Sequence, residues 1–187
     1  MHLLSYARWA ALTAFIWATN VHACPTLLQH QFARLQDGAP QSLCQYKDKV
    51  LLVVNTASYC GFTNQYQGLE ALHKRYAASG LVVLGFPSND FGRQEPGDAQ
   101  QIADLCFNTY GVEFPMFAKT VVAGPKATAF YQQLAKASGS VPGWNFHKYL
   151  ISANAQQVTG FDSANKPLGG PLEAAIKDAL QRLANNQ

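Results

Sequence analysis

The run Val-Leu-Leu-Val-Val at positions 50–54 is continuously apolar, and a second run, Leu-Val-Val-Leu-Gly-Phe, follows at positions 81–86. Strands that are buried on both faces show this pattern, and they occur in sheets that are covered by helices. Between the two runs, residues 66–78 carry apolar side chains at helical spacing and end at Gly80. The order of strand, helix and strand predicts a right-handed crossover between parallel strands.

The rest of the chain extends this unit. Asp98 and Gln101 have the spacing of a capping box, and Gly111 is expected to stop the helix that they begin. Residues 32–35 and 41–43 predict a hairpin around a turn at Asp37-Gly38. The remaining periodic segments are expected helices over about 127–137 and from Pro171 onward, and expected strands over 148–151 and 157–161. Together these elements predict a single α/β domain with a central mixed sheet.

Length and composition agree with one folded domain. The chain has 187 residues, of which 48% are hydrophobic and 13% are charged, and this composition excludes a disordered chain. The formal net charge is +3, without runs of like charge. So small a surplus gives no reason to expect nucleic-acid binding.

The first segment has the features of a signal peptide. Arg8 is the first charge, and an apolar run follows over residues 9–18 that is too short to span a bilayer, so no stable membrane insertion is expected. Short aliphatic Val21 and small Ala23 predict cleavage after Ala23, which leaves residues 24–187 as the mature domain in the periplasm or outside the cell. The alternatives are an N-terminal helix that is retained, or a lipid anchor on Cys24. The anchor is less favoured because His22 does not suit a lipoprotein signal.

The four cysteines divide into two pairs. Exported compartments are oxidising, and Cys24 and Cys44 flank the expected hairpin, so we expect a structural disulfide between them. The alternative is two unpaired thiols. The pairing leaves Cys60 and Cys106 for chemistry.

Cys60 lies in a loop that leaves the carboxyl end of the first buried strand, and a second loop, 87–97, leaves the next strand. Ligands bind at this edge of open α/β sheets, and a helix start favours the thiolate, which is the reactive form of cysteine. The alternative is an ordinary half-buried cysteine. Thr63 stands where a C-x-x-C motif has its second cysteine, which disfavours a dithiol exchanger. Cys106 is the remaining candidate partner, unless it is an inert residue on the apolar face of its helix.

Three blocks of this sequence resemble the signatures of glutathione peroxidases. They are Asn-Thr-Ala-Ser-Tyr-Cys-Gly-Phe-Thr at 55–63, Phe-Pro-Ser-Asn-Asp-Phe-Gly-Arg-Gln-Glu-Pro-Gly at 86–97, and Trp-Asn-Phe-His-Lys-Tyr-Leu at 144–150. The resemblance implies a thioredoxin fold and the reduction of hydrogen peroxide and organic or lipid hydroperoxides. It implies that Cys60 is the peroxidatic residue and that Gln94, Trp144 and Asn145 surround it. Without the resemblance, Gln94 fits a solvated loop residue, Trp144 a core aromatic residue and Asn145 a turn former.

The resemblance is closest to the cysteine-containing, thioredoxin-dependent type, here in an exported bacterial form. Cys106 falls where that type carries its resolving cysteine, which attacks the sulfenic acid of Cys60 to form a disulfide. The family commonly has Gln at position 90 and often Cys at position 88, but this chain has Asp90 and Ser88. The connection over 121–127 lacks the insertion that builds tetramers in the animal enzymes, so a monomer is expected.

The expected enzyme needs no cofactor or metal. Its peroxide-formed disulfide is recycled by a thioredoxin-like dithiol or by glutathione. Two rival functions remain, namely a thiol–disulfide exchanger and an exported metal chaperone without peroxidase activity. A soft-metal site in a chaperone needs Cys, His or Met side chains close together, and His147 and Met116 are the candidates.

Overall fold

The apolar run at 50–54 lies in strand β3 (Val50–Thr56), whose residues are all buried in the computed structural model, which describes residues 23–185. β3 pairs in parallel with β4 (Leu81–Pro87) and antiparallel with β5 (Lys148–Ile151), and β5 pairs antiparallel with β6 (Val158–Phe161). The strand order is β4-β3-β5-β6. The sheet is therefore mixed, as the sequence predicted.

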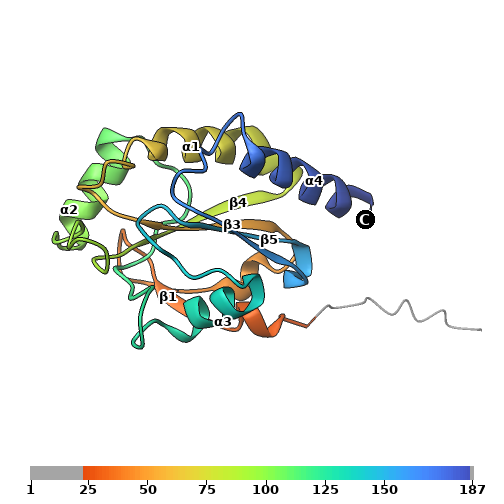
Figure 1. The fold of residues 1–187 in the computed structure, drawn as a ribbon, viewed down its shortest axis with the longest axis horizontal. Coiled ribbons are helices and arrows are strands. Elements are labelled where there is room, and N and C mark those ends of the chain that lie inside the picture. The colour runs from red at the N-terminus through yellow and green to blue at the C-terminus, as the bar shows by residue number, and fades with distance from the viewer. Residues whose placement is uncertain (1–22, 186–187) are drawn as a thin grey trace, which may run out of the picture.

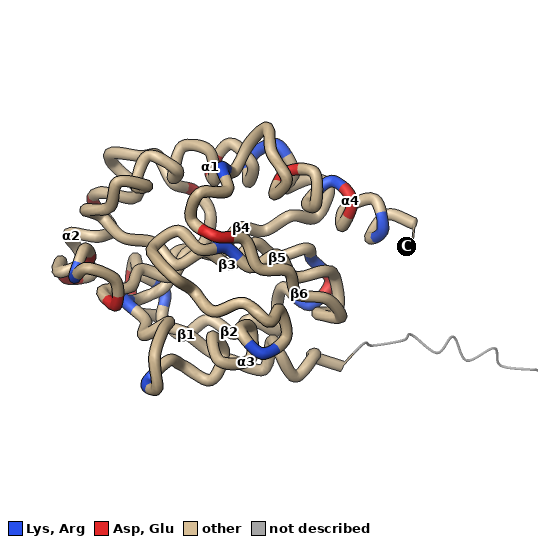
Figure 2. Tube along the Cα trace, viewed as in Figure 1, with Lys and Arg blue, Asp and Glu red and all other residues tan. Residues whose placement is uncertain are grey.

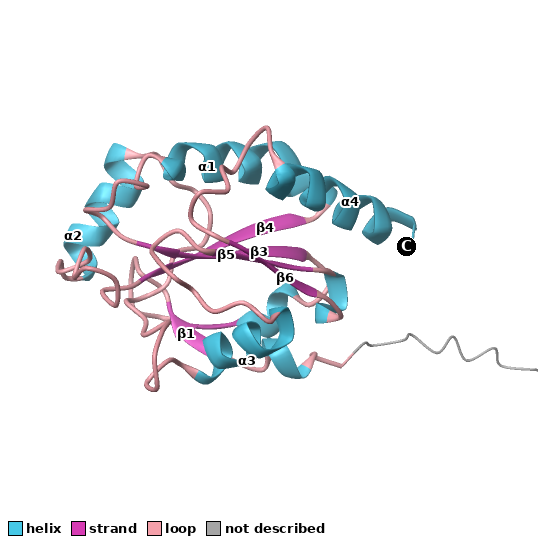
Figure 3. Ribbon diagram, in the orientation of Figure 1, coloured by secondary structure: helices cyan, strands magenta, loops and turns pink. Residues whose placement is uncertain are grey.

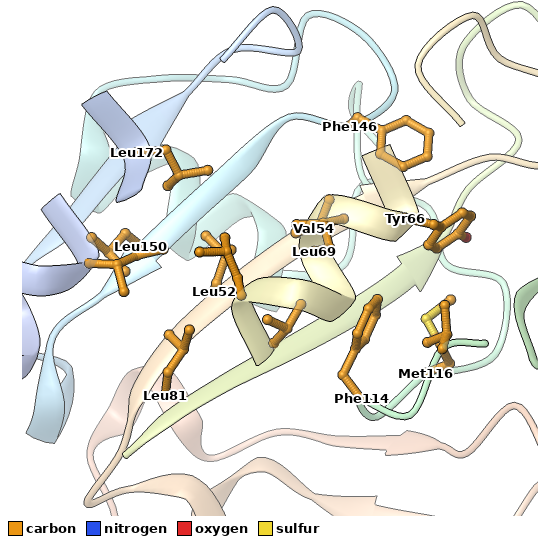
Figure 4. Close-up of a cluster of buried hydrophobic side chains, with 14 of the residues drawn as sticks. Leu52, Val54, Tyr66, Leu69, Leu81, Phe114, Met116, Phe146, Leu150 and Leu172 are labelled. Atoms are coloured by element: carbon orange, nitrogen blue, oxygen red, sulfur yellow. The ribbon is translucent and has the colours of Figure 1, made fainter. Parts of the chain in front are cut away.

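Helices cover both faces of this sheet (Figure 1). α1 (Gln65–Tyr76) and α4 (Pro171–Asn185) lie on one face, and α3 (Ala129–Ser138) lies on the other face with the N-terminal hairpin. Alternate residues of β3 pack into the cores on the two faces of the sheet, because successive side chains along a strand point to opposite faces. Leu52 and Val54 belong to the core under α1 and α4 (Figure 4), and Leu51 belongs to the core under α3.

α2 (Ala99–Ala103) lies beyond one end of the sheet (Figure 3). It begins with the expected capping box, in which Asp98 and Gln101 each accept a hydrogen bond from the other's backbone N–H. The expected α-helix does not continue to Gly111, because residues 104–109 form a π-helical segment, η4 (Asp104–Thr109). Its wider turns carry hydrogen bonds such as the one from Tyr110 N–H to the Leu105 carbonyl, 3.2 Å.

The hairpin consists of β1 (Gln31–Ala33) and β2 (Pro40–Ser42), which pair antiparallel. β1 ends earlier than expected because the chain turns to a different partner, and Leu35 N–H donates to the Met116 carbonyl. Short 3₁₀ turns, η1 (Thr26–Leu28) and η2 (Leu43–Tyr46), flank the hairpin, and two more are η3 (Ala77–Ser79) after α1 and η5 (Ala153–Ala155) between β5 and β6.

Cys24 and Cys44 form a disulfide that joins the start of the described chain to η2, with their Cα atoms 5.5 Å apart. This is the pair that the sequence analysis expected. The bridge closes the loop that contains the hairpin. In the chain-entropy model, a disulfide that closes a loop of this length stabilises the folded state by roughly 3 kcal/mol, because it restricts the unfolded chain.

Charged residues of both signs are scattered along the chain (Figure 2). Over residues 23–185, no helix has both the length and the apolar character needed to cross a bilayer. The expected signal peptide, residues 1–23, lies outside the described residues except for Ala23.

Candidate active site

The loop between β3 and α1 holds Cys60 just before the start of α1. The side chain is 8% exposed, and its Sγ accepts a hydrogen bond from the Phe62 backbone N–H at 3.4 Å. The Thr63 hydroxyl accepts the Cys60 N–H at 3.1 Å and lies 2.7 Å from the Cys60 carbonyl oxygen. Thr63 therefore occupies the position of the second cysteine of a C-x-x-C motif as a structural residue that fixes this turn.

Gln94 and Asn145 meet beside this turn. The Asn145 side chain is fully buried, and its Nδ2 donates to Gln94 Oε1 at 3.0 Å. The Gln94 carbonyl in turn accepts the backbone N–H of Tyr59, the residue before Cys60, at 3.0 Å. These bonds connect the second and third sequence blocks to the Cys60 loop.

Trp144 lies at the same edge with its side chain 40% exposed. Its ring centroid is 5.9 Å from that of Phe91, and a Cβ on Gly92 would lie 3.3 Å from its Cη2 atom. Gly92 therefore allows the loop after β4 to approach the indole closely, and its φ of +61° also favours glycine.

Asn55, at the end of β3, clamps the segment that carries Trp144 and Asn145. Asn55 Nδ2 donates to the Trp144 carbonyl at 3.1 Å, and the Asn55 carbonyl accepts the Phe146 N–H at 2.6 Å. Phe146 has a φ of +63°, a left-handed conformation that is strained for a bulky residue. Sequence reasoning did not identify this clamp, although a buried Asn that ends an apolar strand is a signal that could have indicated it.

The family resemblance implied that Gln94, Trp144 and Asn145 surround Cys60. In this structure the Asn145 Nδ2 donates to Gln94 Oε1 at 3.0 Å and to the Phe91 carbonyl at 3.4 Å. These two bonds use both hydrogens of the Asn145 amide. The Cys60 sulfur receives its bond from the Phe62 backbone. The structure thus brings Gln94, Trp144 and Asn145 to the edge that holds Cys60, and it holds the Asn145 amide in a bond to a neighbour.

Cys106 lies in η4 and is fully buried. Its thiol donates a hydrogen bond to the Tyr66 hydroxyl oxygen at 3.3 Å, and burial raises the pKa of Cys106 to about 12. Cys60, Tyr66 and Cys106 belong to one hydrophobic cluster under α1, in which Figure 4 shows Tyr66 beside Phe146. The two free thiols therefore share one buried region on the same face of the sheet.

Glu95 is a buried carboxyl group that sequence reasoning missed. Its side chain is fully buried, and neither carboxyl oxygen has a hydrogen-bond partner of good geometry. Burial raises the pKa of Glu95, and the nearby Ser58 opposes this only in part. No sequence signal indicated it, because a charged residue between Gln and Pro in a loop is usually solvated.

Asp90, one of the two departures from the family pattern, stabilises a neighbouring loop. Its Oδ2 accepts the backbone N–H groups of Val122 and Ala123 at 2.6 and 3.1 Å. The carboxylate is thus bonded to the short connection over 121–127. Ser88 is fully buried, and its hydroxyl accepts the Asp90 N–H at 3.4 Å.

The residues considered for a metal site are core residues. His147 is 3% exposed and packs on the Tyr149 ring at 4.7 Å, and burial lowers the pKa of His147 to about 4. Met116 is 1% exposed and packs against Gly85. Across residues 23–185, no three His, Cys, Asp or Glu side chains are grouped so that they could hold a metal ion.

Comparisons with known proteins agree with this geometry. The family model for glutathione peroxidase matches residues 28–135. A hydroperoxy fatty acid reductase, gpx1, from Synechocystis sp. is 45% identical over 148 residues, which cover 72% of this chain and 86% of that protein. The crystal structure of Trgpx in apo form is 32% identical, with a TM-score of 0.66 over 83% of this chain and 96% of that one.

A third comparison concerns the fold alone. A thiol:disulfide interchange protein of the thioredoxin family from Chlorobium tepidum has a TM-score of 0.62 over 84% of this chain and 98% of that one, at 18% identity. This likeness confirms the thioredoxin fold that the sequence resemblance implied. From the matched blocks, the identity to relatives and the fold, the chain belongs to the glutathione peroxidase family.

Proposed function

We propose that this peroxidase reduces hydroperoxides with Cys60 as the peroxidatic thiol and Cys106 as the resolving thiol. The observation that carries the proposal is that both free thiols lie in one buried cluster, and that Cys60 is at the edge where Gln94, Trp144 and Asn145 meet. Family membership indicates the reaction, and the geometry supports these residues as the ones that perform it.

In the first step, the Cys60 thiolate attacks the terminal oxygen of the hydroperoxide. A sulfur–oxygen bond forms and the oxygen–oxygen bond breaks, so that Cys60 becomes a sulfenic acid. The leaving alkoxide or hydroxide takes up the proton that the Cys60 thiol released on ionising and departs as alcohol or water. The Phe62 N–H stabilises negative charge on the sulfur at 3.4 Å. The Trp144 indole and the Gln94 amide orient the peroxide, and Asn145 holds the Gln94 side chain in place beforehand through its bond to Gln94 Oε1.

In the second step, the Cys106 thiol attacks the Cys60 sulfenic sulfur. The disulfide forms, and the hydroxyl group of the sulfenic acid leaves as water with the proton of Cys106. A disulfide requires Cα atoms within about 7 Å. Cys106 must leave its bond to Tyr66, and the π-helical hydrogen bonds of η4 make this segment the one that opens.

A dithiol reductant then restores both thiols. We propose a thioredoxin-like protein as the reductant, with glutathione as the alternative, and an exported, monomeric enzyme. The apolar run at 9–18, the small residues before Cys24 and the Cys24–Cys44 disulfide all fit an oxidising compartment.

Fluorescence tests this proposal directly, because a chain that begins at Cys24 retains Trp144 as its single tryptophan. One equivalent of hydrogen peroxide should produce a fast change in fluorescence as Cys60 is oxidised, followed by a slower change as η4 opens and the disulfide forms. A dithiol should restore the initial signal. Consumption of peroxide at Cys60 with flat fluorescence would contradict the placement of Trp144 beside the sulfur.

A further inference from the structure

Glu95 is a buried carboxyl group that the two-step mechanism above does not use. Two other glutamates, Glu70 and Glu173, are also buried, but each accepts a backbone N–H, at 2.8 and 2.7 Å, and pairs with a cation. Within residues 23–185, neither oxygen of Glu95 has a hydrogen-bond partner of good geometry, and Glu95 takes part in no ion pair. Burying a carboxyl group in this way costs free energy, so the fold alone does not explain Glu95.

The backbone that carries Glu95 is fixed against the Cys60 turn. The Glu95 N–H donates to Asn89 Oδ1 at 2.9 Å. The carbonyl of the preceding residue, Gln94, accepts the Tyr59 N–H at 3.0 Å. Because Tyr59 directly precedes Cys60, the segment of Glu95 is bonded to the loop that holds the peroxidatic thiol.

The same segment continues to the helix that carries Cys106. Gly97, two residues after Glu95, lies against the start of α2, where a Cβ on Gly97 would be 3.7 Å from Ile102 Cγ1. Ile102 and Cys106 are four residues apart across the junction of α2 and η4, so they share one face of the helical segment. Both are buried in the cluster that contains Cys60. Glu95 therefore lies on the connection between the elements of the two thiols.

The electrostatic environment agrees with this placement. Burial, and after it the charge of Glu95, raise the pKa of Cys106 to about 12. Burial likewise raises the pKa of Tyr66, to which the charges of Cys106 and Glu95 both contribute. The pKa of Glu95 is itself raised by burial, and the nearby Ser58 and the charge of Lys119 oppose this rise. A carboxylate with a raised pKa is a stronger base than an ordinary one.

The resolving step requires such a base. The thiolate is the nucleophilic form of cysteine, and a thiol with a pKa of about 12 is almost wholly protonated at neutral pH. The Tyr66 hydroxyl accepts the Cys106 hydrogen bond at 3.3 Å, but it does not take the proton, because it is itself a very weak base. Glu95 is the buried carboxyl group whose charge acts on this thiol.

We propose that Glu95 is the proton acceptor for Cys106 in the disulfide-forming step, an inference that rests on the proposed roles of Cys60 and Cys106. When η4 opens, the Cys106 thiol gives its proton to the Glu95 carboxylate, and the Cys106 sulfur attacks the sulfenic sulfur of Cys60. The sulfur–sulfur bond forms and the sulfur–oxygen bond breaks. The leaving hydroxide takes the proton from Glu95 and departs as water, so that Glu95 returns to the carboxylate.

The test measures Cys60 oxidation and disulfide formation separately in the full chain. The reduced protein is mixed with one equivalent of hydrogen peroxide at pH 5 to 9, quenched with acid at successive times and digested with pepsin. Residual peroxide reports the first step, and the peptide that joins Cys60 to Cys106 reports the second. Glu95→Gln keeps the side-chain size and removes the proton acceptor. Glu113→Gln is the matched control, because Glu113 is an exposed carboxylate in the loop after η4.

In the parent, the rate of disulfide formation should rise as the pH passes through the pKa of Glu95, above its ordinary value of 4.5, and should then level off. Glu95→Gln should form the disulfide about 10²-fold more slowly at pH 7, the lower end of general-base effects. Its rate should rise by about tenfold per pH unit up to pH 9, because hydroxide must then remove the proton. Cys60 oxidation in Glu95→Gln, and both rates in Glu113→Gln, should match the parent.

The inference is wrong, while the proposed function stands, if Glu95→Gln forms the disulfide at the parent's rate. It is also wrong if the parent's own rate rises by about tenfold per pH unit over the whole range, since no base of the protein then acts. This second result needs only the parent, so it decides the question even if Glu95→Gln does not fold.

Two further results would give Glu95 a structural role instead. One is that Glu95→Gln slows Cys60 oxidation as much as disulfide formation, which would make Glu95 a support of the Gln94 loop. The other is that hydrogen exchange of residues 104–109 falls in Glu95→Gln as much as the disulfide rate does, which would assign Glu95 to the opening of η4. If the parent forms no Cys60–Cys106 peptide, the resolving role of Cys106 fails, and the inference fails with it.

Discussion

Cys60 and Cys106 lie in the same buried cluster, but their surroundings differ. Cys60 is in a turn fixed by Thr63 before a regular helix, and a backbone N–H points at its sulfur. Cys106 is in a π-helical segment, and its thiol is itself the donor, to the Tyr66 hydroxyl. The Cys60 sulfur thus accepts a hydrogen bond from the backbone, whereas burial favours the neutral thiol of Cys106.

This difference fits the opposite roles proposed for the two cysteines. A peroxidatic cysteine must be reactive in the folded state, so its environment is rigid and supplies a hydrogen-bond donor. A resolving cysteine must stay unreactive until the sulfenic acid has formed, so its reactivity depends on local opening. The predictions below test this contrast, and the largest expected effect comes first.

Cys60→Ser should reduce steady-state turnover by at least about 10³-fold, because the nucleophile is removed. Cys106→Ser should retain the fast fluorescence change and lose the slow one, leaving a sulfenic acid that a specific probe can label. Both variants should show the far-UV circular dichroism of the parent. Substantial turnover in folded Cys60→Ser would refute the assignment.

Asn145→Ala should slow the oxidation of Cys60 by about 10²-fold, the effect of removing one positioned polar group. The variant loses the bond to Gln94 that links the Cys60 loop to the third block. Stopped-flow fluorescence of the fast phase measures this rate. Asn108→Ala is the control, because this exposed residue of η4 should leave the fast phase unchanged.

The buried Cys106 thiol should make stability depend on alkaline pH. The pKa of Cys106 is raised to about 12 in the folded chain from an ordinary value of 9.0, so the unfolded chain loses this proton first. The stabilising contribution is complete below about pH 9 and is lost as the pH rises towards 12, by about 1.4 kcal/mol per pH unit. Urea denaturation from pH 7 to 11 should show this loss in Cys60→Ser.

The control for this titration is Cys60→Ser combined with Cys106→Ala. Tyrosines and lysines titrate in both proteins, so the difference between the two curves isolates Cys106. If the unfolding free energies of the two proteins keep a constant difference above pH 9, the Cys106 thiol is not buried in the folded chain and the prediction is wrong.

Tyr66→Phe should accelerate the slow phase by about 2–10-fold. The change removes the hydroxyl that accepts the Cys106 hydrogen bond at 3.3 Å, a bond worth about 0.5–1.5 kcal/mol. Tyr110→Phe removes a hydroxyl from the neighbouring ring and is the control. A slower second phase in Tyr66→Phe would instead indicate that the Tyr66 hydroxyl assists the loss of the thiol proton.

Local sequence patterns correctly predicted the structural elements that depend on residues close together in the sequence. The apolar runs became β3 and β4, and Asp98 with Gln101 formed the capping box. The π-helical segment was missed because a pattern of buried residues does not distinguish hydrogen bonds to i−5 from those to i−4 in a short helix. The Asn55 clamp was missed because its bonds reach Trp144, about 90 residues away along the chain, and the burial of Glu95 was missed because it lies near Ser58, about 40 residues away.

Cys60 was singled out by its place at the end of a buried strand, whereas Gln94, Trp144 and Asn145 were predicted from the family resemblance rather than from spacing. Gln94 and Asn145 are about 50 residues apart, and nothing local indicates that their amides meet. The resemblance did not indicate the present bonding of Asn145 or the role of Asp90. Both depend on which backbone groups lie within reach after the loops have packed.

Disulfide mapping after oxidation tests the central claim most directly. The full chain is treated with one equivalent of hydrogen peroxide, alkylated, digested without reduction and analysed by mass spectrometry. We predict a peptide that joins Cys60 to Cys106, together with the Cys24–Cys44 peptide that is already present before peroxide is added. A Cys60 sulfinic acid with free Cys106, or a link from Cys60 to Cys24 or Cys44, would contradict the account.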